Sequence, residues 1–88
     1  MNRYLLRKLI KKFNQNRKPE CFAKTRKNNK KFLLIEFSGS TASHSCCFDE
    51  YFNDLAYLFK DEIGLKLKIE DIKKRDLNKF LVKYNILN

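Results

Sequence analysis

Positive charge is concentrated at one end of this 88-residue chain. Twelve of its 20 lysines and arginines precede Phe32, against a single acid, Glu20, so residues 1–31 carry a formal charge of +11 while residues 32–88 carry −1. Repulsion among so many like charges disfavours a compact state. Whatever this chain folds into, counterions or an anionic partner must offset that repulsion.

Composition nevertheless predicts a folded core. Hydrophobic residues make up 43% of the chain and aromatic residues 14%, which is unlike an intrinsically disordered basic tail. We expect one small domain over residues 1–88, too small for a large buried cleft. There is no long uncharged apolar stretch and no secretory signal, and the three cysteines lack the spacing of a disulfide scaffold. These features predict a cytoplasmic protein without a membrane span.

Apolar residues with helical spacing predict a first helix over residues 2–15. Leu6, Leu9, Ile10 and Phe13 recur at i, i+3, i+4 and i+7, which places them on one face, with the lysines and arginines opposite. Proline cannot continue a helix, so Pro19 lies beyond its end. The first helix is therefore predicted to be apolar on one side and strongly basic on the other.

Two short strand-like runs follow and predict a β-hairpin. They span residues 20–26 and 32–37, and residues 27–30 lie between them, where two asparagines tolerate the left-handed backbone of a tight turn. The second run is apolar on both faces, as in a central strand covered on more than one side. It also contains Glu36, for which we expect a basic partner on the neighbouring strand. The first run is the better candidate for an edge strand.

The second half of the chain repeats the order helix, strand, strand. A wide apolar stripe from Phe48 to Phe59 predicts a second helix, and Gly64 is a suitable C-terminal cap. Residues 65–70 and 80–86 alternate in polarity and predict two paired strands. Residues 71–78 are expected to form a polar connection, with a short helix starting at Asp76 as the alternative.

The resulting fold class is α/β, in the form of an α+β two-layer domain with the order α-β-β-α-β-β. Its helices are expected to pack on one mixed sheet of about four strands. The second helix then serves as the crossover between parallel second and third strands.

The basic N-terminal third is the first candidate site, because clustered cations can follow a phosphate backbone and release condensed counterions. We expect it to bind nucleic acid, with an acidic protein partner, a membrane surface or a merely solvated face as alternatives. RNA is favoured over DNA because no helix-turn-helix or zinc-finger pattern is present. The candidate contact residues are Arg3, Arg7, Lys8, Lys11, Lys12, Arg17, Lys18, Lys24, Arg26, Lys27, Lys30 and Lys31.

Neutral side chains among these cations extend the hypothesis. Tyr4 and Phe22 are each either core residues or, if they face outward, stacking platforms for an unpaired base. Nearby amides are candidates for hydrogen bonds to phosphates or base edges. These amides belong to Asn14, Gln15, Asn16, Asn28 and Asn29.

A small-residue loop before the second helix is a second, weaker candidate. Backbone N–H groups at a helix start can bind an anion, and a cysteine there can act as a thiolate with a histidine as its base. An ordinary helix cap and idle thiols explain the same residues. The residues of this candidate are Ser40, Ser43, His44, Cys46 and Cys47.

No complete catalytic set accompanies that loop. A third orienting residue is not evident, and the adjacent Cys46 and Cys47 lack the gap of a zinc-binding knuckle even when Cys21 is added. We therefore expect no metal, no cofactor and no enzymatic activity, with a thiol-dependent enzyme as the least favoured alternative. Self-association through a sheet edge is a further one.

Overall fold

A computed structural model describes residues 1–15, 17, 21–39 and 49–87. Its first helix, α1, spans Arg3–Gln15, close to the predicted range. Asn2 caps it, because its side-chain Oδ1 accepts hydrogen bonds from the backbone N–H groups of Tyr4 at 2.8 Å and Leu5 at 3.2 Å. The buried face of α1 consists of Leu6, Leu9, Ile10, Phe13 and Asn14.

The second helix, α2, spans Asp49–Ile63. It ends at Gly64, which has φ of +67° and donates its N–H to the carbonyl of Lys60 at 2.9 Å. This left-handed cap is readily adopted by glycine and confirms its predicted role. Both helices therefore end where local sequence signals indicate.

The four strands form one sheet in the order β1-β2-β4-β3. The strands span Phe22–Asn28 (β1), Phe32–Ser38 (β2), Leu67–Asp76 (β3) and Lys79–Ile86 (β4). The α+β class and the element order are confirmed, but the prediction of a mixed sheet is wrong, because every neighbouring pair is antiparallel. The second and third strands do run in the same direction, yet β4 lies between them, so α2 connects strands that are not neighbours.

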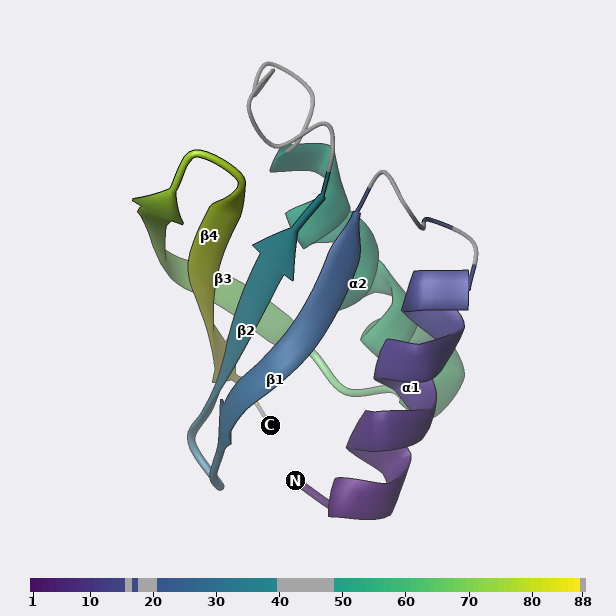
Figure 1. The fold of residues 1–88 in the computed structure, drawn as a ribbon. Helices are drawn as coiled ribbons and strands as arrows, with labels where there is room; N and C mark the ends of the chain where they lie inside the picture. Colours follow the sequence, from purple (N-terminus) through teal and green to yellow (C-terminus); the bar gives the residue numbers. More distant parts are fainter. Residues whose placement is uncertain (16, 18–20, 40–48, 88) are drawn as a thin grey trace.

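Both helices cover one face of this sheet, and the core lies between the two layers (Figure 1). The paired residues Leu33 and Tyr84, and Ile35 and Val82, point to the helices and are buried. Phe37 continues the row and contacts α1 through Phe13, whose ring centroid lies 5.9 Å away. The core therefore joins α1, β2, β4 and α2 into one unit.

Neither of the two described helices covers the other face of the sheet (Figure 1). The prediction that β2 is central is confirmed, but coverage on both faces is not found. Leu34 and Glu36 alternate with the buried residues of β2 and lie half-buried on the open face. Arg26 Nε lies 3.9 Å from a carboxylate oxygen of Glu36, which is the expected basic partner.

Two turns differ from their predictions. β1 continues through Asn28, and Asn29 closes the turn by accepting hydrogen bonds at its Oδ1 from the backbone N–H groups of Lys31 and Phe32, both at 2.9 Å. No described non-glycine residue has a positive φ, so the asparagines do not adopt the left-handed backbone expected of them. At the other hairpin β3 continues to Asp76, which replaces the predicted polar connection and the alternative short helix.

Among the described residues, no helix is long and apolar enough to cross a membrane.

Candidate functional site

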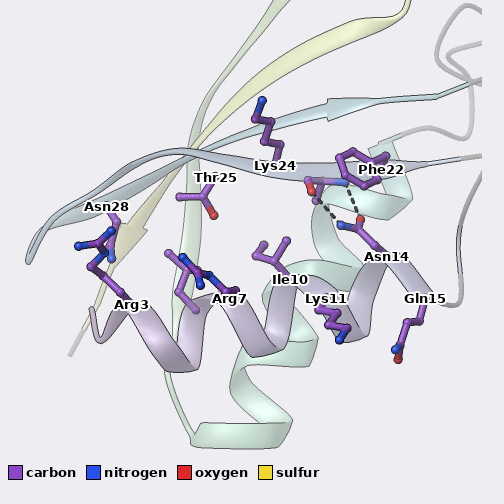
Figure 2. A pocket seen from close by; sticks show the side chains of 12 residues that line it. Arg3, Arg7, Ile10, Lys11, Asn14, Gln15, Phe22, Lys24, Thr25 and Asn28 are labelled. Atoms are coloured by element: carbon purple, nitrogen blue, oxygen red, sulfur yellow. Dashed lines mark hydrogen bonds between the residues drawn. The ribbon is translucent and has the colours of Figure 1, made fainter.

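A groove of about 680 Å³ runs between α1 and the edge strand β1 (Figure 2). Its helical wall carries Arg3, Arg7 and Lys11, and its strand wall carries Lys24. Within the described residues, no carboxylate lines this groove and none of these four side chains forms an ion pair. The groove therefore concentrates positive charge in a concave surface, where its electrostatic field is focused.

Helical spacing explains why these three cations of α1 share a wall. Residues 3, 7 and 11 are four positions apart, so their side chains follow one another along a single flank of the helix. Figure 2 shows Arg3 and Arg7 extending from α1 toward β1, whereas Lys24 points away from the helix. Lys24 pairs in register with Glu36, which places it at the rim of the groove next to the open sheet face.

Asn14 fixes one end of the groove by joining α1 to the edge of the sheet. Its Nδ2 donates to the carbonyl of Ala23 at 2.9 Å, and its Oδ1 accepts from the N–H of Ala23 at 2.7 Å (Figure 2). The carboxamide thus occupies the edge of β1 as another strand would. Residues alternate in direction along a strand, so Thr25, two positions on, also directs its backbone groups toward the groove.

Besides Arg17, two cations of the predicted surface belong to ion pairs instead of the groove. Lys12 contacts Glu62 of α2 on the opposite flank of α1, and Arg26 lies beside Glu36 on the open sheet face. Exposed pairs of this kind contribute little stability, about 0–1 kcal/mol. Their positive charge is nevertheless matched locally, so these two residues are weaker candidates than the sequence indicates.

Arg17 has a structural position. Its guanidinium lies 4.3 Å from the centre of the Phe13 ring and donates to the carbonyl of Phe13 at 3.1 Å. The same guanidinium lies 3.7 Å from a carboxylate oxygen of Asp54. These contacts close the end of α1 and connect it to α2, so Arg17 acts in packing rather than at a free surface.

The remaining described cations lie on either side of the groove. Lys8 is exposed on the outer side of α1, and Lys27, Lys30 and Lys31 are exposed along β1 and in the hairpin turn. Lys18 lies outside the described residues. The structure thus divides the predicted surface into a cationic groove, a cationic hairpin and a set of locally paired residues.

The hairpin cations continue onto the open sheet face around Phe32. The ammonium groups of Lys27 and Lys83 lie 5.8 Å and 4.6 Å from the centre of its half-buried ring. Lys83 also lies 3.3 Å from Glu70. Hydrogen bonds from Asn85 and Lys83 lower the pKa of Glu70, so the Glu70 carboxylate adds a negative charge to this part of the face. It is less uniformly positive than the groove.

The neutral candidate residues differ in their exposure and in whether they line the groove. Tyr4 faces solvent and is 72% exposed, whereas Phe22 is half-buried and lines the groove. Gln15 lines the groove and is exposed. The other described amides are engaged within the fold, since Asn14 binds Ala23, the Asn28 Nδ2 donates to the carbonyl of Met1 at 2.9 Å, and Asn29 closes its turn.

The second candidate site, comprising Ser40, Ser43, His44, Cys46 and Cys47, lies outside the described residues.

Cys21 is described, and it is fully buried. Burial raises the pKa of its thiol to about 12, with the positive charge of Arg17 lowering it and the negative charge of Asp54 raising it. Cys21 is therefore a protonated core residue and not an activated thiolate.

Comparison of the chain with protein-family models, curated proteins and solved structures found no match.

Sequence reasoning missed the groove itself and the role of Asn14. One signal was present: Asn14 lies four residues after Ile10 and one after Phe13, so it extends the apolar stripe of the helix. A polar side chain on a buried helix face must find hydrogen-bonding partners. That requirement points to a contact with another element, although not to the residue that supplies it.

Proposed function

We propose that this chain binds nucleic acid through the groove between α1 and β1. In this proposal the phosphates lie against Arg3, Arg7, Lys11 and Lys24, and the backbone continues toward the hairpin lysines. The observation that supports it is that, of the residues that the structure describes, four cationic side chains and no carboxylate line the groove. Three other cations of the basic third, Lys12, Arg17 and Arg26, lie beside acids instead.

The start of α1 gives a second reason to expect an anion. The positive end of a helix dipole favours acidic residues, but the first turn of α1 contains none and begins with Arg3. Arg3 therefore adds positive charge where it is already unfavourable, and Arg7 follows it one turn later. A bound phosphate would offset both the side-chain charges and the helix dipole.

RNA fits the groove better than DNA in this proposal. The lining offers the hydroxyl of Thr25 and the amide of Gln15 beside the cations. Such groups exchange hydrogen bonds with a 2′-hydroxyl, which DNA lacks. Regular base-specific readout of a duplex would instead require an element placed in a groove of that duplex.

Self-association through a sheet edge is less consistent with the edges observed. The edge of β1 faces α1 and is occupied at Ala23 by Asn14, and its register shifts between Thr25 and Lys27. β3, the other edge strand, has two register shifts and is largely composed of exposed charged residues. Irregular and charged edges resist pairing with another strand.

The test compares two variants that lose the same charge. The groove variant combines Arg3→Ala, Arg7→Ala, Lys11→Ala and Lys24→Ala. The matched control combines Lys60→Ala, Lys66→Ala, Lys73→Ala and Lys74→Ala, which lie on α2, on β3 and in the segment between them. Circular dichroism checks that both variants fold. Fluorescence anisotropy then measures their affinity for a labelled single-stranded RNA of about ten nucleotides, within the usual range of site sizes.

We expect the groove variant to lose more than tenfold in RNA affinity at near-physiological salt. The slope of its affinity against salt should fall by about 3, because each phosphate contact to a single strand contributes about 0.7. The control variant should change affinity no more than about threefold, since its cations do not line the groove. Equal losses in both variants would show that net charge alone matters, and the absence of RNA binding by the unmodified chain would overturn the proposal.

A further inference from the structure

Tyr4 is the most exposed of the large apolar side chains in the described residues, at 72%. It lies on the outer side of α1, three residues before Arg7 and four before Lys8, and neighbours at these spacings share a helix surface. Arg3, which precedes it, and Arg7 both line the groove. Tyr4 does not itself line the groove, and its ring lies beside Arg7 and Lys8 on the same surface of the helix.

The backbone beneath this ring is held in place. Tyr4 donates its own N–H to the Oδ1 of Asn2, and the next turn is closed by a hydrogen bond of 3.0 Å from the N–H of Leu6 to the carbonyl of Asn2. A tyrosine has few rotatable bonds, so little conformational entropy is lost when a ligand orders its side chain. The ring is consequently a suitable binding surface even though it is exposed.

We propose that Tyr4 is a stacking platform for an unpaired base, so that the nucleic acid bound by the groove is single-stranded. This inference rests on the proposed function. A base stacked on the ring would have its phosphates within reach of Arg7 and Lys8. Against an apolar protein surface, those phosphates would instead be desolvated and left without a cationic partner. In a duplex the base faces are already stacked on one another, so Tyr4 would gain no comparable contact.

The chain contains a matched control for this ring. Tyr57 of α2 is 63% exposed, its charged neighbours at helical spacing are Asp54, Lys60 and Asp61, and no residue of α2 lines the groove. Replacing Tyr57 removes the same side chain from a surface of mixed charge that does not line the groove.

The experiment measures affinity for a single-stranded RNA of about ten nucleotides, for the same strand with abasic sites, and for a duplex of equal length. The proteins are the unmodified chain, Tyr4→Ala, Tyr4→Phe and Tyr57→Ala. We expect Tyr4→Ala to weaken binding of the intact single strand about tenfold, with an unchanged salt slope because no charge is removed. Tyr4→Phe keeps a stacking ring and should stay within about twofold, as should Tyr57→Ala.

The abasic strand and the duplex separate stacking from a structural effect. Tyr4→Ala should bind both as well as the unmodified chain does, because neither presents an unpaired base. If Tyr4→Ala binds the intact single strand normally, or loses affinity equally for all three probes, the stacking inference is wrong while the proposed function stands. If the unmodified chain binds the duplex more tightly than the single strand, the ligand is double-stranded. If it binds no probe, both proposals fail.

Discussion

Replacing Asn14 by leucine tests how α1 is attached to the sheet. In the native fold the carboxamide satisfies both backbone groups of Ala23, at 2.9 Å and 2.7 Å, and Asn14 is only 7% exposed. Leucine has a similar size but no polar group, so Asn14→Leu leaves a buried N–H and a buried carbonyl without partners. Each such group costs about 2 kcal/mol, which gives a loss of about 4 kcal/mol.

Helix propensity offsets only a small part of that loss. Leucine is more favourable than asparagine inside a helix by about 0.5 kcal/mol, so the net loss is about 3.5 kcal/mol. A domain of this length has a free energy of unfolding of about 4–13 kcal/mol. At about 4–8 °C per kcal/mol, Asn14→Leu should lower the Tm by about 14–28 °C.

A second substitution distinguishes lost hydrogen bonds from lost packing. Asn14→Ala opens space beside the groove, through which water can reach Ala23 and partly satisfy it, so we expect alanine to destabilise less than leucine. A site governed by apolar packing would show the reverse order. Urea unfolding followed by circular dichroism gives both values, with the exposed neighbour Gln15→Leu as a control that should stay within about 0.5 kcal/mol. If the free energy of unfolding of Asn14→Leu equals that of the unmodified chain, the hydrogen bonds of Asn14 do not stabilise the fold.

Two further predictions follow from the start of α1 and from the core. Arg3→Glu places an acid at the positive end of the helix dipole, so it should raise stability by about 1 kcal/mol, seen as a higher Tm, while weakening RNA binding; a lower Tm would contradict this account of the helix start. Burial raises the pKa of Cys21 to about 12 and raises that of Tyr84, whose hydroxyl donates to the carbonyl of Phe52 at 2.7 Å. The folded state therefore holds more protons than the unfolded state above pH 9, and stability should fall as pH rises from about 9 toward 12. Urea midpoints that stay constant over that range would show that these two groups do not govern alkaline unfolding.

Local periodicity predicts much of this fold. The apolar spacing of α1 predicts its buried face, the apolar run of β2 predicts a central strand, and the alternation of β4 predicts a strand that supplies the core. Each of these signals lies within one element, where burial imposes a fixed period. The cap at Gly64 is similarly local.

Pairing between distant segments was harder to predict. Alternation predicts that β4 is a strand, but it does not predict that β4 pairs with β2 as well as with β3. This pairing places β4 between β2 and β3 and makes the whole sheet antiparallel. The far half of β3 has weak periodicity because it is exposed, with Ile72 at 41% and register shifts on either side. A hairpin that extends beyond the helices buries too little to produce a clear hydrophobic signal.

For the candidate site, too, the sequence predicts local features but not contacts between distant segments. Sequence reasoning treats the cations before Phe32 as one surface, because their number and sign are evident without a structure. It does not reveal that Lys12 turns toward Glu62 or that Arg17 packs on Phe13, since these partners come from the tertiary arrangement. The four cations that line the groove share a position that only the packing of α1 against β1 defines.

Amide NMR spectra of the isotope-labelled chain, recorded while single-stranded RNA is added at near-physiological salt, test the central proposal most directly. We predict shifts concentrated in residues 3–15 and 22–28, which form the two walls of the groove, with little change in α2 and β3. Shifts confined to α2 and β3, or spectra that do not change at saturating RNA, would contradict the proposal that this groove binds nucleic acid.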